Sequence, residues 1–378
     1  MKLAARLILS ITLGASASVR AFDAEATSAE QKAPPNASPP PSATPGVSET
    51  PSADKQTAAK KKASPTVFGF MQAHFRHARD TGGEAGVVDA TNFRMQRVRI
   101  GVKGDIFPWL SYQVEIDPRS PEITGVLRDA YMSFDFIPDH ELRVGQQKTQ
   151  FGYENTESSS ELFAVNRTEL ADTLSRGINL RDIGVGLIGH IKLGGGWRFE
   201  DAITVVNGAG LNVQADNTRR KNVWGRVGVR YKNKPGDLMF RFGLSGATGD
   251  LIDEGNDPID PRDDFRQTFN RLGTDVQIDH KRFFLSAEYV KGHDENALTG
   301  GGDDRSGYYV SVAGKTRFDV GPILRLDTLG EEFRRFTVGA YYALPKAPLR
   351  VMLNYEFRKL RDGARADDKF YVWTQVRF

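Results

Sequence analysis

The chain of 378 residues has 51 Lys and Arg residues against 48 Asp and Glu residues, and it contains no cysteine. The absence of cysteine excludes a disulfide framework and a cysteine-linked lipid anchor. The positive excess of three charges lies before residue 65, so the remainder is neutral and gives no indication of nucleic-acid binding.

Residues 1–21 have the features of a secretory signal peptide. Basic residues precede a short apolar run at 7–13, and small residues suitable for cleavage follow. Cleavage could follow Ala17 or Ala21, and the second position is favoured. The apolar run is too short to cross a hydrocarbon core of about 30 Å, so we expect export rather than a membrane-anchoring helix.

Residues 22–64 are rich in Pro, Ala, Ser and Thr and have few large apolar side chains. Such a segment buries too little apolar surface to offset the entropy lost on ordering, so we predict a disordered periplasmic extension. The lysine run at 60–62 is most simply a solvated charge run. Contact with anionic lipid headgroups or with peptidoglycan is the alternative.

From residue 65 to residue 378 polar and apolar residues alternate, which is the pattern of β-strands with two different faces. The alternation is without exception between Leu110 and Asp117. The thirteenth stretch is the least secure, so counts of fourteen or eighteen stay open. Sixteen stretches can be placed, at 66–76, 93–104, 109–117, 126–136, 141–148, 182–192, 197–207, 222–232, 238–248, 270–279, 282–292, 307–317, 322–327, 334–343, 348–358 and 369–378.

The connections between these stretches alternate in length as well. Short turns, such as 105–108, 137–140 and 319–322, alternate with longer polar links, such as 249–269 and 328–333. Outer-membrane barrels have short periplasmic turns, long external loops and both termini inside. Because lipid offers no hydrogen bonds to an open sheet edge, the sheet must close. We therefore predict an all-β fold, a transmembrane antiparallel β-barrel of about sixteen strands, in the outer membrane of a Gram-negative bacterium.

The last nine residues predict the closing strand of this barrel, paired in antiparallel fashion with the first strand near Val67–Phe75. We expect the terminal Phe378 to be a signal for the outer-membrane assembly machinery. We expect the side chains of Tyr371, Gln375 and Arg377 to point toward the lumen or the periplasmic rim. The face in contact with lipid should carry Phe370, Val372, Thr374, Val376 and Phe378.

The longest link, from Thr149 to Arg181, is too long for a simple hairpin. With its apolar patch at 162–165 it can fold inward and narrow the aqueous channel of a sixteen-stranded barrel. An external flap is the alternative. If the loop folds inward, the narrowest point is lined by Glu154, Glu157, Glu161, Arg167, Glu169, Asp172, Arg176 and Arg181.

Several segments resemble the phosphate-selective porin O and P family. The most specific pieces are Val144–Lys148 and Phe151–Glu154, where a Gly-Gln-x-Lys…Phe-Gly pattern ends the strand that enters the loop. The resemblance implies a sixteen-stranded barrel, a homotrimer and passage of small solutes with a preference for anions. It covers most of residues 66–378 and is carried by 97–117, 127–154, 175–191, 271–290 and the terminal strand.

An anion channel needs cationic side chains along one face of its lumen, and the guanidinium fork of Arg suits phosphate better than Lys does. Acidic residues, including Glu115 and Asp129, share the predicted lumen. The other interpretation is that most of these charges pair across the wall as structural ion pairs. The candidate channel-lining and anion-binding residues are Arg97, Arg99, Lys103, Arg143, Lys148, Arg176, Arg181, Arg226 and Arg230.

The expected function is that of an outer-membrane porin, a water-filled channel for passive diffusion of small hydrophilic solutes, with a preference for anions such as phosphate as a further expectation. A structural tether or adhesin that uses the Pro-rich extension is the alternative. The six histidines have no companion Ser motif, so no enzyme is expected. No cofactor or metal is expected either, because the acidic link 253–264 lacks EF-hand spacing. The glycine pattern at 184–189 is assigned to a strand rather than to a dinucleotide site.

Overall fold

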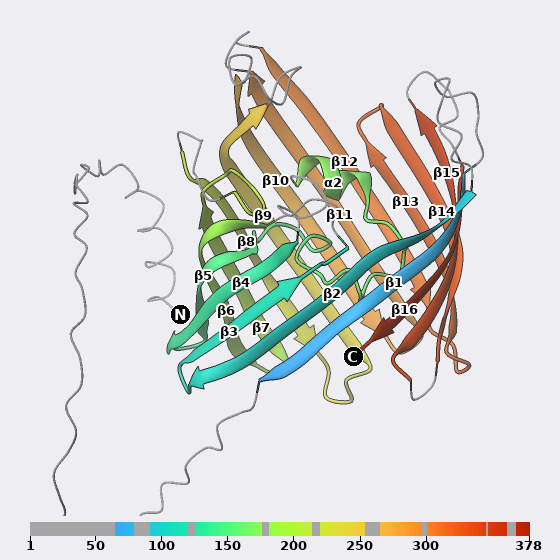
Figure 1. The fold of residues 1–378 in the computed structure, drawn as a ribbon, viewed down its shortest axis with the longest axis horizontal. Helices are drawn as coiled ribbons and strands as arrows, with labels where there is room; N and C mark the ends of the chain where they lie inside the picture. The colour runs from blue at the N-terminus through green and yellow to red at the C-terminus, as the bar shows by residue number, and fades with distance from the viewer. Residues whose placement is uncertain are drawn as a thin grey trace, which may run out of the picture. The chain divides into compact units, whose positions relative to one another are not determined.

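Sixteen β-strands form one closed antiparallel barrel in which each strand pairs with its neighbours in the chain (Figure 1). The computed structural model describes residues 65–78, 91–119, 126–175, 181–213, 220–253, 265–296, 301–344, 347–360 and 368–378. The predicted signal peptide and Pro-rich extension lie outside these residues. Among the described helices, none has the length and apolar character needed to cross a bilayer.

The predicted number of strands is confirmed, and the described part of the chain adds one short helix, α2 (Glu169–Leu174). The strands are β1 (Thr66–Ala78), β2 (Thr91–Phe107), β3 (Leu110–Ile116), β4 (Leu127–Ile137), β5 (His140–Lys148), β6 (Arg181–Gly194), β7 (Trp197–Val206), β8 (Asn222–Lys232), β9 (Leu238–Asp253), β10 (Phe265–His280), β11 (Phe283–Asn296), β12 (Gly302–Gly314), β13 (Val320–Leu329), β14 (Phe333–Ala343), β15 (Leu349–Leu360) and β16 (Lys369–Arg377).

The last strand closes the barrel, as predicted, by pairing with the first. Arg377 of β16 lies opposite Phe70 of β1, and the antiparallel ladder continues to Lys369 opposite Ala78. The backbone N–H of Gly69 donates to the carbonyl of Phe378 at 3.0 Å, and Phe378 returns a hydrogen bond of 3.1 Å. No edge is left between these two strands, which is what a strand pair in lipid requires.

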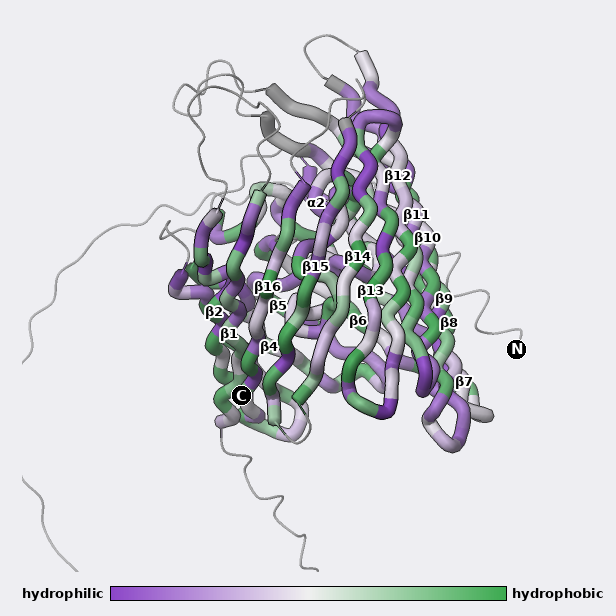
Figure 2. Tube along the Cα trace, turned by 90° about the vertical axis from the view of Figure 1, so that its right-hand side faces the viewer, coloured by the Kyte–Doolittle hydropathy of each residue, from purple (hydrophilic) through white to green (hydrophobic). Residues whose placement is uncertain are grey.

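The two faces of β16 differ as the alternation predicts. Tyr371, Trp373 and Gln375 point inward and are at most 4% exposed, whereas Val376 and Phe378 are 39% and 57% exposed. Figure 2 shows hydrophobic and hydrophilic positions alternating along the strands around the wall. The apolar outward face and the polar inward face are those of a membrane barrel.

Three predicted connections differ from the structure. The β9–β10 hairpin is longer than expected, because β9 runs to Asp253 and β10 begins at Phe265. The backbone pairing of the two strands continues into polar residues that the alternation pattern does not include. The link expected at 328–333 is a tight turn of three residues, which Gly330 permits through its positive φ of 54°. The turn expected at 319–322 ends earlier, since β13 begins at Val320.

Residues 149–175 lie inside the barrel against its wall. The amide of Gln72 on β1 donates to the carbonyl of Ser159 at 3.2 Å, and the N–H of Val165 donates to Asn354 on β15 at 2.9 Å. The helix α2 contacts β11, β12 and β13. The hydroxyl of Thr168 caps this helix by accepting from the N–H of Ala171 at 3.2 Å. The loop is therefore fixed to several strands at once.

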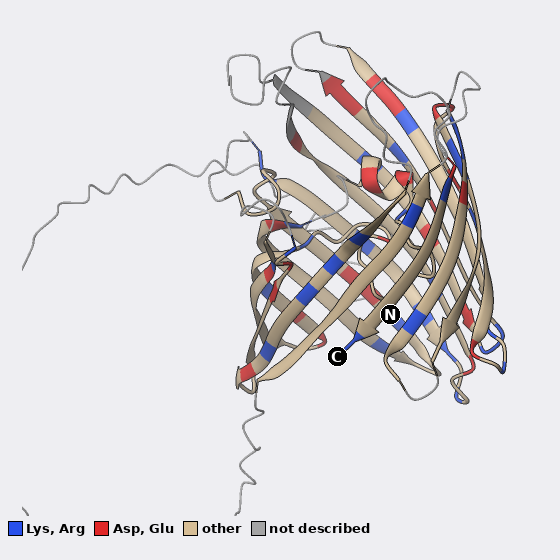
Figure 3. Ribbon diagram, turned by 45° about the vertical axis from the view of Figure 1, so that its right-hand side comes forward, with Lys and Arg blue, Asp and Glu red and all other residues tan. Residues whose placement is uncertain are grey.

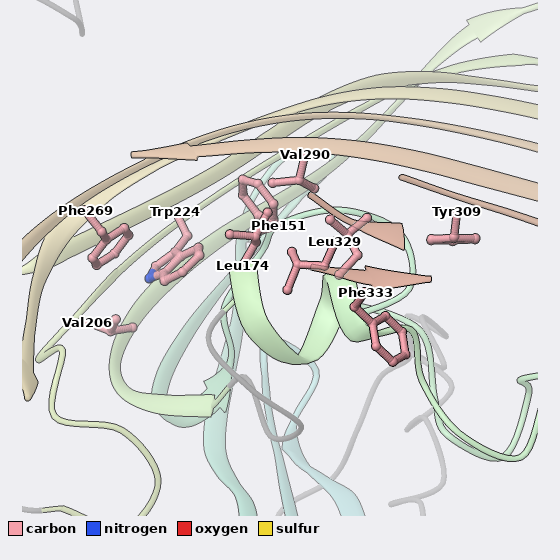
Figure 4. Packing of buried hydrophobic residues seen from close by; sticks show 10 residues of the cluster. Phe151, Leu174, Val206, Trp224, Phe269, Val290, Tyr309, Leu329 and Phe333 are labelled. Atoms are coloured by element: carbon pink, nitrogen blue, oxygen red, sulfur yellow. The ribbon is translucent and has the colours of Figure 1, made fainter. Parts of the chain in front are cut away.

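Two apolar clusters hold the loop in place. The first joins its early part and α2 to residues of β7, β8 and β10–β14, and Figure 4 shows Phe151 beside Trp224 and Val290. The second surrounds Val165, which belongs to the patch 162–165 and is 1% exposed. The first cluster consists of Phe151, Leu170, Leu174, Val206, Trp224, Phe269, Val290, Tyr309, Leu329 and Phe333. The second contains Ala313, Ile323, Tyr341, Met352, Tyr371 and Trp373 beside Val165.

Candidate functional site

A cavity of about 510 Å³ lies inside the barrel between the loop and the wall formed by β1–β9. The loop contributes Thr156, Glu157 and Ser158 to its lining. Charged side chains of both signs project from the strands, and Figure 3 shows Lys and Arg beside Asp and Glu over the barrel wall. Five of the nine candidate residues line this cavity, namely Arg99, Arg143, Lys148, Arg181 and Arg226.

Arg99 and Arg181 meet two carboxylates at the loop side of this cavity. Arg181 donates two hydrogen bonds to Asp129, at 2.8 and 2.9 Å, in the bidentate geometry of a guanidinium–carboxylate pair. Arg99 donates to Glu115 at 3.1 Å, and Glu115 also lies 3.6 Å from Arg181. All four side chains are less than a tenth exposed. The two positive charges are therefore neutralised within the wall.

A second group of charges links β7, β8, β9 and β10. Arg226 donates to both oxygens of Asp275, at 2.9 and 2.6 Å. Arg241 donates to both oxygens of Glu200, at 2.6 and 3.1 Å, and Glu200 also lies 3.8 Å from Arg226. Arg226 and Asp275 come from β8 and β10, which are not neighbours, and Gly243 on the intervening β9 leaves the space that they need.

Arg143 and Lys148 lie on β5, which leads into the loop. Arg143 donates to both oxygens of Glu141, at 2.7 and 2.9 Å, and its guanidinium lies 4.8 Å from the ring centre of Tyr131. Lys148 donates to two carbonyl oxygens of the loop, those of Thr156 at 3.2 Å and Glu157 at 2.8 Å. Lys148 thus fixes the loop through carbonyl oxygens, without a bonded carboxylate.

The remaining candidates lie elsewhere. Arg97 is 6% exposed and donates to the amide oxygen of Gln72 at 2.9 Å, outside the cavity lining. Lys103 is exposed at the short-turn end of β2, with its ammonium 5.4 Å from the ring centre of Phe68. Arg176 lies outside the described residues. Arg230 lines a separate cavity of about 440 Å³ at the short-turn end of β6–β8.

This second cavity contains a row of basic residues, of which only Arg230 was predicted from the sequence. Lys192, Arg198 and Arg230 lie directly opposite one another on β6, β7 and β8. Arg241 continues the row on β9, outside this cavity and paired with Glu200. Lys232 and Lys234 also line the cavity, and none of its described lining residues is acidic. Adjacent like charges are destabilising, so this row makes the short-turn mouth strongly attractive to anions. The strand parity alone places Lys192 and Arg198 on the inward face, which would have found them.

The opposite side of the barrel holds a dense ionic network around the loop. Arg335 on β14 donates to Asp327 on β13 at 2.9 Å and to the carbonyl of Arg167 at 2.7 Å. Glu154 accepts from both the N–H and the hydroxyl of Thr168, at 3.0 and 2.5 Å. The Arg335 contacts join loop and wall on the β13–β14 side, and the Glu154–Thr168 contacts hold the loop together internally; no sequence pattern indicated this network.

Asp172 in α2 has the most perturbed carboxyl group of the loop. Its burial and the neighbouring negative charge of Glu154 raise its pKa to about 7. Its Oδ1 has no hydrogen-bond partner. An acid that ionises near neutral pH therefore lies in the loop, beside the basic residues Arg167 and Arg335.

A closed sixteen-stranded barrel with an apolar outer face, a charged interior and an internal loop is the architecture of an outer-membrane porin. The model of the family phosphate-selective porin O and P matches residues 68–296, and the chain belongs to this family. It is therefore a channel of the Gram-negative outer membrane that passes small solutes, and its family consists of channels rather than enzymes.

Several solved structures share this fold. The anion-selective porin from Comamonas acidovorans is 15% identical, with a TM-score of 0.59, over 83% of this chain and 99% of that one. The trimer form of OmpT from Vibrio cholerae is 12% identical, with a TM-score of 0.56 over 83% and 99%. The channel DcaP of Acinetobacter baumannii is 13% identical, with a TM-score of 0.54 over 85% and 99%. Among curated protein sequences there is no significant match.

Proposed function

We propose that this porin prefers anions and that the loop 149–175 narrows its solute path. The observation that carries the preference is the basic row Lys192–Arg198–Arg230 at the short-turn mouth, which has no acidic residue in its described cavity lining. Such a row raises the local concentration of anions and disfavours cations. The anion selectivity stated for the Comamonas porin agrees with this proposal.

The solute path runs through the cavity of about 510 Å³ on the β1–β9 side. Most guanidinium groups there are paired with carboxylates, so the wall has a transverse field rather than a uniform positive potential. The preference is consequently expected to be moderate, and phosphate is one suitable anion because arginine forks match its oxygens. Lys148, which lines this cavity and has no bonded carboxylate, is the strongest candidate near the loop.

The test is single-channel recording in planar bilayers with the full exported chain. In a salt gradient the reversal potential should show anion preference, and added phosphate should block chloride current. Arg198→Gln combined with Arg230→Gln should shift the reversal potential toward zero, while exposed turn residues changed in the control variant Arg282→Gln/Arg317→Gln should leave it unchanged. If Arg97→Ala and Arg143→Ala both leave ion selectivity unaltered, the two residues do not contribute to it.

The assembly is proposed to be a homotrimer without catalytic activity, which crosslinking and mass measurement in detergent would test. The alternative of a tether or adhesin rests on residues 22–64, which lie outside the described residues. Silence in the bilayer experiment, from a protein shown to be folded, would favour that alternative.

A further inference from the structure

The outer surface of the barrel carries an aromatic band at the long-loop end of β14, β15, β1 and β2. Phe336 lies opposite Phe357 with ring centres 6.3 Å apart, and Tyr355 lies 4.6 Å from Phe357. Phe75 and Phe93 continue the band at 5.2 Å. Phe336 and Phe357 are each 43% exposed. Aromatic residues gather at this depth because their rings suit the boundary between acyl chains and headgroups.

Two cations lie directly beyond this band on the same face. Arg334 and Lys359 are opposite each other in the β14–β15 ladder. Each is two residues from Phe336 or Phe357, so each is about 7 Å closer to the external loops. Both are exposed. The pair therefore lies at headgroup depth at the end of the barrel opposite Thr66 and Phe378.

No interaction within the described residues compensates these charges. Neither Arg334 nor Lys359 forms a hydrogen bond or an ion pair with a described residue. The adjoining turn also carries two acidic residues, Glu331 and Glu332, and Glu331 has an interaction partner of its own. Like charges directly opposite each other on a sheet are destabilising. Because Arg334 and Lys359 repel each other at the membrane boundary, an anion bound between them from the lipid side would relieve the repulsion.

Another cation at the same end provides a contrast. Lys291 on β11 lies two residues beyond Tyr289 on the outward face, as Lys359 lies two residues beyond Phe357. Its opposite residue is the neutral Ser306, and the next outward pair is the ion pair His293–Asp304. The excess of positive charge is thus stronger on β14–β15 than on β11–β12.

We propose that Arg334 and Lys359 bind the phosphate group of a phosphorylated glycolipid of the outer leaflet, with its acyl chains against Phe336, Tyr355 and Phe357. The guanidinium and the ammonium would share the phosphate oxygens through charge-assisted hydrogen bonds. Free phosphate would receive only those bonds, whereas a lipid also buries its chains on the aromatic face. The lipid is therefore the preferred source of the anion.

Native mass spectrometry of the full exported chain with lipid A tests the proposal. The folded protein should retain bisphosphorylated lipid A more strongly than the dephosphorylated lipid with the same chains. Arg334→Gln/Lys359→Gln should weaken the phosphorylated complex by about 30-fold, as two interfacial cations contribute. Binding of the dephosphorylated lipid should change little. If the double variant does not fold, each single variant should weaken the complex by roughly 5-fold.

The control is Arg282→Gln/Arg317→Gln, which removes the same amount of positive charge at the short-turn end of the barrel. Arg317 also lies beside an aromatic residue, with its guanidinium 4.7 Å from the ring centre of the exposed Phe318. This variant should bind lipid A like the parent protein. Equal loss in this control, or equal retention of the two lipids by the parent, would overturn the proposal. Displacement of lipid A by millimolar inorganic phosphate would show that the site binds the free ion instead.

Discussion

The ring of Phe151 packs edge-on against the indole of Trp224, with the ring centres 5.7 Å apart and the planes at 83°. Phe151 is near the start of the loop and Trp224 projects inward from β8, and both are at most 1% exposed. The contact fixes the loop to the wall soon after the chain leaves β5. In the proposed channel, the width of the solute path therefore depends on this packing as well as on charge.

Replacing Phe151 by Ala should loosen the loop and enlarge the passage. Removal of a fully buried Phe costs about 3–5 kcal/mol, and the barrel ladders do not depend on this ring. We expect a higher and noisier single-channel conductance with a barrel that still folds. Phe283→Ala, which removes an exposed ring of β11, is the matched control. A conductance identical to that of the parent protein would show that the loop does not limit the current.

The pair Arg181–Asp129 provides a test of how paired charges affect selectivity. Asp129→Asn leaves the guanidinium of Arg181 with one fewer carboxylate, and breaking a buried pair costs about 3–5 kcal/mol. The channel should become less stable and more selective for anions. Reversal potentials and thermal unfolding would measure the two effects. Arg181→Gln should lower anion preference, and a double-mutant cycle would give the coupling between the two residues.

The loop acid Asp172 should make the channel sensitive to pH. Its pKa is raised from the usual 3.8 to about 7 by burial and by Glu154. Its proton is therefore held more tightly in the folded loop, so its contribution to stability is complete below about pH 4 and is lost as the pH rises to about 7. As the pH approaches 7, Asp172 ionises and adds a negative charge inside the barrel.

Anion preference should consequently be higher at pH 5.5 than at pH 8. Reversal potentials at the two pH values measure the difference, and Asp172→Asn should remove most of it. A pH response that persists unchanged in Asp172→Asn would assign the effect to another group.

The terminal residue should matter more for assembly than for conduction. Phe378 exchanges two backbone hydrogen bonds with Gly69, and a side chain at Gly69 would come within 2.7 Å of the Phe378 ring. Deletion of Phe378, or Gly69→Val, should lower the folded fraction measured by heat-dependent migration in denaturing gels. Channels that do form should conduct normally. Arg377→Gln, at the exposed rim, is the control and should assemble like the parent.

The number of strands, the closing pair and the inward faces of strands such as β3 and β16 could be predicted from the sequence, because alternation and turn chemistry are local. The pairing of Arg226 with Asp275 could not. It spans two strands and depends on Gly243 between them, so it becomes visible only when the register of three strands is known. The contacts of the loop are similarly hidden, since Val165 and Asn354 are 189 residues apart.

The ionic network around Arg335 and the second apolar cluster lie on the β12–β16 side, whereas the larger cavity borders β1–β9. The two halves of the barrel wall are therefore subject to different constraints. Substitutions among the inward residues of β13–β15 should mainly affect whether the protein folds. Substitutions of cavity-lining residues on β2–β9 that belong to neither a buried ion pair nor an apolar cluster should mainly affect which solutes cross, so new specificities can arise there while the other half of the wall preserves the fold.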